Sequence, residues 1–161
     1  MNDNNKTKTT ELTPEGFEEL KAEMEDLVSD KLPKAIKRVS DAREYGDLSE
    51  NSEYHDARDD KNLIDTRISE IEKILEKATI VQATRSKKRV GMGSQVVIHH
   101  KGKSSETRTL QIVGEYEADP TEGKISSVSP LGKALMGKKK GDVVTYQAPA
   151  GEIVYIVLEI K

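Results

Sequence analysis

Residues 54–78, YHDARDDKNLIDTRISEIEKILEKA, decide the fold. Reading at alternating steps of three and four gives a set of positions that are apolar with one exception, Lys61: Tyr54, Ala57, Lys61, Ile64, Ile68, Ile71, Leu75 and Ala78. A repeat of seven residues with two apolar positions is typical of a helix that packs along one seam against another helix. The stretch therefore predicts one long helix of a coiled coil.

The partner helix is predicted upstream, from Pro14 to about Glu44. Thr13 suits the N-cap and Pro14 the first helical position. Beside Pro33, which cannot donate a backbone hydrogen bond, a local irregularity is expected. The predicted seam of this helix consists of Phe17, Leu20, Met24 and Leu27, and then of Leu32, Ile36 and Val39.

The two predicted helices are joined by a short turn at residues 45–49. Helices of roughly 30 residues with so short a connection must fold back antiparallel, as a rod on the order of 45 Å long. The turn then lies at the far tip of a helical hairpin.

After Ala78 the sequence changes to β-branched runs separated by turn residues. Alternating patterns predict a small antiparallel sheet. A short helix is expected to interrupt it, with Ser129 as N-cap, Pro130 at the first position and Gly137 as the stop. The predicted strands are 95–100, 107–113, 124–128, 142–148 and 152–160. The fold class is therefore α+β, with an N-terminal antiparallel coiled-coil hairpin in residues 1–80 and a sheet domain in residues 81–161.

Charge divides the chain in the same way. Residues 1–78 hold 13 Lys/Arg and 21 Asp/Glu, a net charge of −8, while residues 79–161 hold 13 and 8, a net charge of +5. Two modules with different tasks would show such a division, and so would a solvated acidic helix pair beside a mildly basic domain.

Composition excludes several classes of protein. The chain has no cysteine, so it has no disulfide framework and no thiolate metal site. The polar segment 1–10 lacks the apolar core of a signal peptide, and no run approaches the roughly 20 apolar residues of a membrane span. We therefore expect a cytoplasmic protein with no membrane partner.

The predicted tip contains carboxylates that allow two interpretations. Residues 43–58 read REYGDLSENSEYHDAR, in which Asp47 precedes Glu50 by three positions. This spacing suits a capping box, with Asp47 capping the second helix and Glu50 reaching back. Alternatively, two carboxylates at the end of a rod form part of a Mg²⁺ site, whose remaining ligands would come from another molecule.

A resemblance to a known family covers nearly the whole chain. Residues 43–58 resemble the tip signature of the Gre transcript-cleavage factors, more of the GreA type than the GreB type. Residues 125–138, ISSVSPLGKALMGK, resemble a second motif of the same family. The resemblance implies a coiled-coil hairpin that enters the secondary channel of bacterial RNA polymerase. It also implies a C-terminal domain similar to FK506-binding proteins (FKBP-like), which docks at the channel rim.

The resemblance also implies roles for particular residues. Asp47 and Glu50 match the acids that help to hold a Mg²⁺ ion shared with the polymerase active site, where backtracked nascent RNA is hydrolysed at its 3′ end. No Mg²⁺ is expected to bind tightly to the free protein. The chain would be an activator of polymerase rather than an enzyme, and a monomer.

Five further residues are expected to contact the polymerase or the RNA. Arg43, Arg58 and Asn51 lie beside the tip, and both arginines could instead pair with nearby carboxylates such as Glu44, Glu53 and Asp56. In the second domain, Ser129 and Pro130 match a family segment near the docking surface, and they are also simply a good helix start. Val128 stands where relatives often carry a polar or acidic residue.

Three rival functions remain open from the sequence. A paralogue could occupy the same channel and inhibit or compete without stimulating cleavage, although such a protein would be expected to alter the tip acids. A prolyl isomerase needs an aromatic-lined pocket, for which residues 79–161 offer Tyr116, Tyr146 and Tyr155. A coiled-coil adaptor with no polymerase partner would account for the apolar repeats but would leave the tip signature unexplained.

Overall fold

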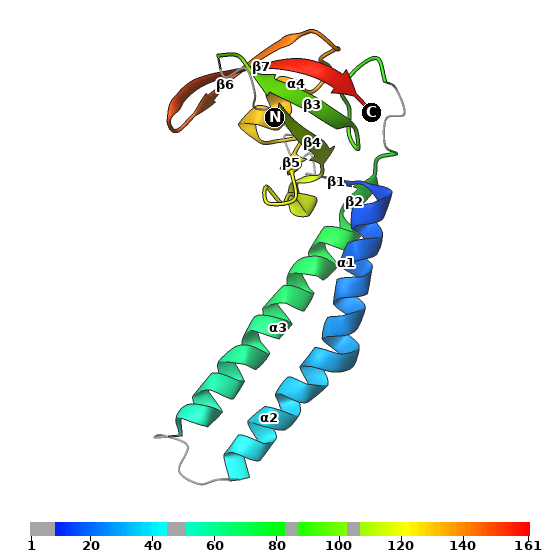
Figure 1. Cartoon of the computed structure of the whole chain (residues 1–161). Helices are drawn as coiled ribbons and strands as arrows, with labels where there is room; N and C mark the ends of the chain where they lie inside the picture. Colours follow the sequence, from blue (N-terminus) through cyan, green and yellow to red (C-terminus); the bar gives the residue numbers. More distant parts are fainter. Residues whose placement is uncertain (1–8, 45–50, 83–86, 103–106) are drawn as a thin grey trace, which may run out of the picture. The chain divides into compact units, whose positions relative to one another are not determined.

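The computed structural model describes residues 9–44, 51–82, 87–102 and 107–161 and confirms the α+β class (Figure 1). Contacts within the chain define two compact units. One unit is the helical segment Phe17–Lys77, and the other joins the segment that ends at Gly16 to Ala78–Lys161. No helix in the described ranges is long and apolar enough to cross a membrane.

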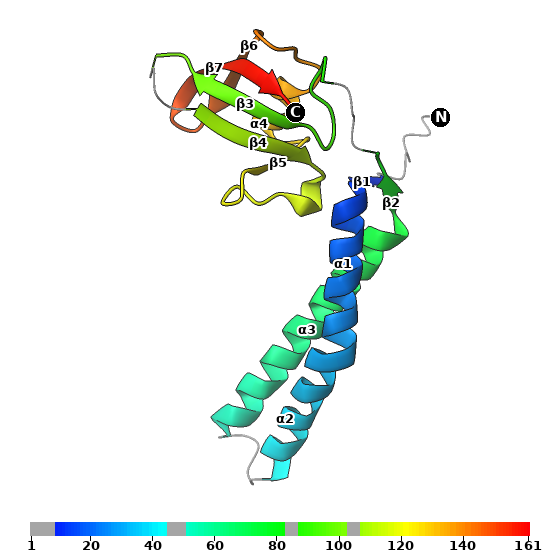
Figure 2. The same cartoon turned by 45° about the vertical axis from the view of Figure 1, so that its right-hand side comes forward.

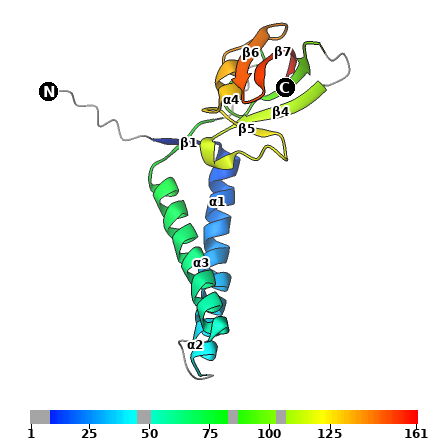
Figure 3. The same ribbon diagram turned by 90° about the vertical axis from the view of Figure 1, so that its left-hand side faces the viewer.

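The helical unit is the predicted hairpin. Its first arm contains α1 (Pro14–Asp26), a π-helical turn η1 (Leu27–Lys31) and α2 (Leu32–Glu44), and its second arm is the single helix α3 (Ser52–Glu76). α2 packs against α3 over most of its length, and Figures 1 and 3 show the two arms side by side. The predicted irregularity beside Pro33 is confirmed as η1.

The π-turn has a simple physical cause and a large effect. Pro33 lacks an N–H, and its ring would collide with the carbonyl of Ser29 in a regular α-helix. The chain widens instead, so that the Leu32 N–H donates to the carbonyl of Leu27, five residues back. A π-turn contains one residue more than an α-turn. The seam is therefore shifted by one residue from this point to the tip.

This shift keeps the charged side chains of the first arm out of the hairpin seam. Continuing the pattern of Leu20 and Leu27 without a shift would place only charged side chains at the seam: Lys31, Lys34, Arg38 and Asp41. The inserted residue replaces them with Leu32, Ala35, Val39 and Ala42, of which the last three are buried. The prediction of Ile36 as a seam residue was wrong, because the shifted seam passes through Ala35 and leaves Ile36 49% exposed.

The second unit is built on a five-stranded sheet. Its strands are β3 (Gln95–His100), β4 (Thr107–Val113), β5 (Lys124–Ser126), β6 (Val143–Ala148) and β7 (Gly151–Ile160), in the order β5-β4-β3-β7-β6. All neighbours are antiparallel except β4 and β5, which run parallel. The predicted strands are confirmed, although β5 ends at Ser126 because Ser127 and Val128 turn toward the next helix.

One face of the sheet carries the core. The short helix α4 (Pro130–Leu135) packs against β6 and β5, as Figure 3 shows. Its Leu135 is fully buried, and Leu131 packs against the same cluster. The buried strand residues of this cluster are Val96, Ile98, Leu110, Ile112, Val144, Tyr155, Val157 and Ile160.

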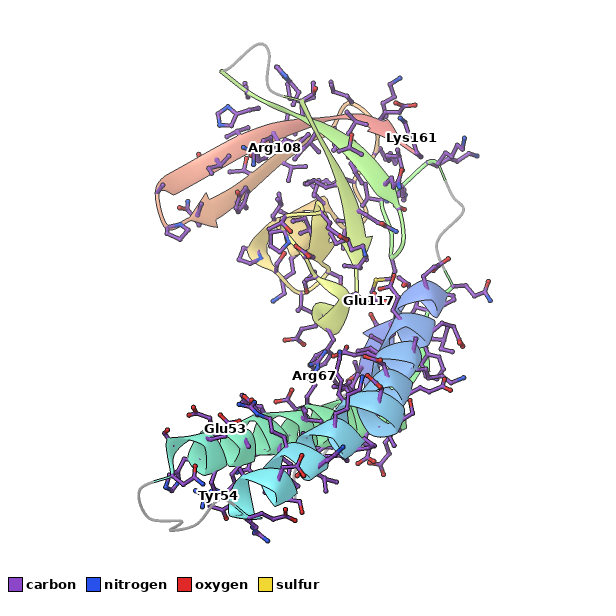
Figure 4. All side chains as sticks on the ribbon, turned by 60° about the horizontal axis from the view of Figure 1, so that its bottom comes forward. Glu53, Tyr54, Arg67, Arg108, Glu117 and Lys161 are labelled. Carbon is purple, nitrogen blue, oxygen red and sulfur yellow. The ribbon has the colours of Figure 1, made fainter. Side chains whose placement is uncertain are left out.

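The first residues of α1 belong to the sheet unit. Strand β1 (Thr10–Leu12) pairs in parallel with β2 (Ala78–Ile80). The Glu117 carboxylate, from the 3₁₀ turn η2 (Glu115–Glu117), accepts hydrogen bonds from the Thr13 N–H (2.9 Å), the Thr13 hydroxyl (2.6 Å) and the Gly114 N–H (2.7 Å). Figure 4 shows Glu117 beside the first turn of α1. Gly16 leaves room for it, since a Cβ there would lie 1.6 Å from Oε1.

Glu117→Ala tests this contact, because it removes one acceptor that serves three donors. Hydrogen bonds to a charged acceptor contribute roughly 2 kcal/mol each, so amide exchange at Thr13 and Gly114 should accelerate by about 30-fold or more. Native-state hydrogen exchange measures both amides. Glu122→Ala is the matched control, since Glu122 makes an exposed ion pair with Lys124, and it should leave both rates nearly unchanged.

Candidate functional site at the hairpin tip

The two acids predicted to carry the chemistry, Asp47 and Glu50, lie outside the described residues. The structure describes both sides of their segment. α2 ends at Glu44, and Asn51 precedes the first residue of α3. The geometry of the candidate site is therefore the geometry of the two helix ends.

Asn51 joins these two helix ends. Its Oδ1 accepts the backbone N–H of Tyr54 at 3.1 Å, which caps α3. Its Nδ2 donates to the backbone carbonyl of Ala42 in the last turn of α2 at 2.9 Å. One side chain thus satisfies an unpaired N–H at the start of one helix and a free carbonyl at the end of the other.

The expected capping box is wrong. It placed Asp47 at the N-cap of α3 with Glu50 reaching back, but α3 begins at Ser52 and its N-cap is Asn51. Asn ranks with Asp among the best N-caps, and here it also reaches Ala42, which a carboxylate without an N–H cannot do. The N-cap of α3 is therefore Asn51 and not Asp47.

Two arginines flank Tyr54 at the same level of the hairpin. The guanidinium of Arg43 lies 5.5 Å from the centroid of the Tyr54 ring, and its Nη2 donates to the Tyr54 hydroxyl over a long 3.4 Å. Hydrogen bonding and charge from Arg43, and to a lesser degree from Arg58, lower the pKa of Tyr54. Tyr54 is labelled near the end of α3 in Figure 4.

The alternative role for these arginines, pairing with Glu44, Glu53 or Asp56, does not occur among the described residues. The carboxylate of Glu53 instead accepts a hydrogen bond from Arg38 Nε at 2.8 Å, and Arg38 also contacts Asp60. Arg43 and Arg58 therefore keep their charges directed at Tyr54 and solvent. The structure brings Arg43, Asn51 and Arg58 together around one tyrosine.

Further from the tip, one ion pair connects the two arms and others lie within the first arm. Arg67 donates to both carboxylate oxygens of Glu23 across the hairpin, at 2.7 and 2.8 Å, and this hydrogen bonding lowers the pKa of Glu23. Both side chains are more than a third exposed, so the pair stabilises the hairpin only modestly. Figure 4 labels Arg67 between the arms. Lys31 and Lys34 pair with Asp26 and Asp30, at 2.8 and 2.7 Å.

Ser129 and Pro130 lie in the other unit, at the start of α4. The Ser129 hydroxyl accepts the N–H of Gly132 at 3.0 Å and donates to the carbonyl of Ser126 at 2.7 Å. Their role as a helix start is therefore confirmed. Val128, which precedes Ser129, is 45% exposed, and Met136, the C-cap of α4, is 40% exposed. A contact between this surface and another protein stays a prediction.

Within the described residues, the histidines belong to no group that could hold a metal ion. His100 meets the edge of Tyr155 at 5.4 Å between ring centroids. No group of three or more His, Asp or Glu side chains suited to a metal ion occurs in the parts of the chain that the structure describes. Asp47 and Glu50 stay the predicted Mg²⁺ ligands: carboxylates suit this ion, but two of them cannot fill its octahedral shell.

Comparison with known proteins assigns the chain to a family. The sequence model "Transcription elongation factor, N-terminal" of GreA and GreB matches residues 10–80, and "Transcription elongation factor, GreA/GreB, C-term" matches residues 85–161. The chain belongs to the GreA/GreB family. Both halves match in order, so the family covers the hairpin and the sheet unit alike.

Several GreA proteins are similar over almost their full length. The transcription elongation factor GreA of Lactococcus lactis subsp. cremoris (strain SK11) is 44% identical over 154 residues, which cover 95% of this chain and 98% of that protein. GreA of Ruegeria pomeroyi is 40% identical over 150 residues, which cover 93% and 96%. The crystal structure of GreA factor homolog 1 (Gfh1) of Thermus thermophilus is 33% identical, with coverages of 96% and 99% and a TM-score of 0.45.

In this GreA/GreB chain, Asn51→Ala should loosen both helix ends at once. It removes the cap of α3 and the link to Ala42, a loss of about 1–2 kcal/mol. Amides in the first turn of α3 should exchange about tenfold faster or more. Asn62→Ala, at an exposed position within α3, is the control and should be neutral or slightly stabilising. Equal protection of this turn in the parent and the Asn51 variant would contradict the assigned role.

Proposed function

We propose that this chain is a transcription elongation factor that binds bacterial RNA polymerase and stimulates its cleavage of backtracked nascent RNA. The observation that carries the proposal is the position of Asp47 and Glu50 in sequence. They occupy the connection between two helix ends that Asn51 fastens together, in a chain of the GreA/GreB family. α3 has 25 residues and is about 37 Å long, so this connection is remote from the base of the hairpin.

A long, thin hairpin suits delivery of its tip through a narrow channel. The seam is narrow beyond the π-turn, because its buried side chains on α2 and at the start of α3 are mainly alanine: Ala35, Ala42 and Ala57. Small residues let the two helices approach closely. Most exposed side chains on the arms are polar, as expected for a segment surrounded by water or by a polar channel wall, although Val28, Ile36 and Leu63 are exposed as well.

The tip acids would act as ligands supplied to the polymerase. Asp47 and Glu50 would hold a Mg²⁺ ion shared with polymerase carboxylates, while those carboxylates complete the coordination shell. When bound, such an ion lowers the pKa of an attacking water and stabilises the negative charge that develops on phosphate oxygens. This chain contributes two negative charges and their placement. It would act as an activator of the polymerase, and the polymerase would carry out the hydrolysis.

The residues around Tyr54 would meet the nucleic acid or the channel wall. Arg43 and Arg58 have no carboxylate partner in the described part of the chain, so their charges are available to phosphate groups of the RNA 3′ end. Asn51 is already engaged by Tyr54 and Ala42. We therefore assign to Asn51 a positioning role rather than a contact.

The sheet unit would dock on the polymerase and tether the hairpin. Tethering raises the effective concentration of the tip at the active site. The proposed docking surface consists of Ser129 and Pro130 at the start of α4, with the exposed side chains of Val128 before it and Met136 at its C-terminal end. The factor would act as a cytoplasmic monomer. The rival function, inhibition of the polymerase without cleavage, is favoured by no observation on this chain.

Asp47→Ala and Glu50→Ala should each abolish stimulated cleavage and leave polymerase binding nearly intact. The reason is that each removes a ligand of the shared ion without touching the docking surface. The measurement uses a stalled, backtracked polymerase complex with end-labelled RNA, and scores the release of short 3′ fragments. Folding should survive, because α3 is capped by Asn51.

Asp59→Ala is the matched control. Asp59 is an exposed carboxylate on α3 with no ion pair among the described residues, and its variant should cleave like the parent. Cleavage at the parental rate by both tip variants would reject the proposed function. Loss of polymerase binding in the tip variants would also contradict the division between tip and docking surface.

A further inference from the structure

The sheet unit also contains a cluster of cationic side chains from two segments that are distant in the sequence. Lys87, Lys88 and Arg89 precede β3, and Lys138, Lys139 and Lys140 precede β6. Two backbone hydrogen bonds hold the segments together: Val90 N–H donates to the carbonyl of Lys138, and Gly137 N–H to the carbonyl of Val90, each at 2.8 Å. Figure 2 shows the green segment before β3 beside the orange segment before β6. We call these six residues the basic cluster.

A tight turn presents part of the basic cluster to solvent. The Lys139 N–H donates to Asp142 Oδ2 at 2.9 Å, and the Asp142 N–H donates back to the carbonyl of Lys139 at 3.1 Å. Gly141 has a φ of +90°, a conformation that side chains other than glycine rarely adopt. The side chains of Lys139 and Lys140 are exposed as a result.

Most charges of the basic cluster have no ion-pair partner among the residues that the structure describes. Lys87, Arg89 and the three lysines at 138–140 form no ion pair with any residue that the structure describes. On the hairpin, by contrast, Lys31, Lys34 and Arg38 each have a carboxylate partner. Holding five or six like charges together raises the energy of the folded state through repulsion. A bound polyanion would remove that repulsion.

We propose that the basic cluster is a binding site for the phosphate backbone of double-stranded nucleic acid. The cations are five lysines and one arginine, and lysine-rich surfaces suit phosphate groups, whereas protein interfaces are depleted in lysine. The cluster contains no aromatic side chain on which unpaired bases could stack, so a duplex is favoured over a single strand. Binding is independent of sequence, since lysine contacts to phosphates carry no sequence information.

This assignment goes beyond the proposed function and does not rest on it. The proposed cleavage activity depends on the tip acids, whereas duplex binding depends on lysines of the sheet unit and is measured without polymerase. Failure of one therefore leaves the other standing. Besides docking on the polymerase, the factor would then also contact a nucleic-acid duplex near the transcribed template.

The test measures binding of the full-length protein to a fluorescent 30-base-pair DNA duplex by anisotropy at several salt concentrations. Six phosphate contacts give a slope of about −5 in a plot of log affinity against log salt, which weakens binding roughly 1,000-fold between 50 and 200 mM. The triple variant Lys138→Gln, Lys139→Gln, Lys140→Gln should bind at least tenfold more weakly at 50 mM. Its slope should fall to about −3.

The control variant, Lys31→Gln with Lys34→Gln and Lys37→Gln, removes three charges from exposed positions on the hairpin and should bind like the parent. Circular dichroism checks that both triple variants are folded. Equal loss of binding in both variants, or no binding by the parent at 50 mM salt, would overturn the assignment.

Two further probes separate the classes of ligand. Single-stranded RNA of the same length should bind more weakly than the duplex, and tighter binding of the RNA would overturn the preference for a duplex. Polyglutamate at equal charge should compete poorly. If it displaces the duplex at equal charge concentration, the cluster recognises an acidic protein surface instead and the nucleic-acid assignment fails.

Discussion

The register of the hairpin depends on one constraint, the missing N–H of Pro33. The π-turn that it causes moves the seam of the first arm by one residue. Without it, Arg38 and Asp41 would face α3 in a narrow apolar seam, and the desolvation of unpaired charges would oppose pairing of the arms. With it, Val39 and Ala42 are buried there, while Arg38 remains outside to pair with Glu53 and Asp60.

The same register sets the geometry of the tip. The Ala42 carbonyl accepts the Asn51 side chain because Ala42 lies on the seam, facing the start of α3. A seam displaced by one residue would turn that carbonyl away. The Asn51 side chain thereby joins the two helix ends between which Asp47 and Glu50 lie in the sequence. The π-turn beside Pro33 thus affects the helix ends next to the residues that are proposed to carry the activity.

The sequence predicted the elements of the fold well and their exact packing less well. The apolar repeat of α3 and the alternating strands follow local rules, so their existence was predictable. Ile36 was misassigned because the sequence shows an offset near Pro33 but not its size. Asp47 was expected to cap α3 because its spacing to Glu50 fits a capping box, whereas the link from Asn51 to Ala42 crosses between helices and has no local signal. The hydrogen bonds between Thr13 and Glu117 span 104 positions, so no local sequence signal could predict them either. The arrangement around Tyr54 could not be predicted for the same reason, since Arg43 reaches Tyr54 from the other helix.

The central claim is that Asp47 and Glu50 share a Mg²⁺ ion with the polymerase, and the Mg²⁺ dependence of cleavage tests it most directly. Asp47→Asn and Glu50→Gln keep the size of each side chain but replace a charged ligand by a neutral one, which attracts the cation less. Each substitution should raise the Mg²⁺ concentration needed for half-maximal cleavage, while calorimetry on the free parent protein should detect no tight Mg²⁺ site. An unchanged Mg²⁺ requirement in both variants, or micromolar binding by the free protein, would contradict it.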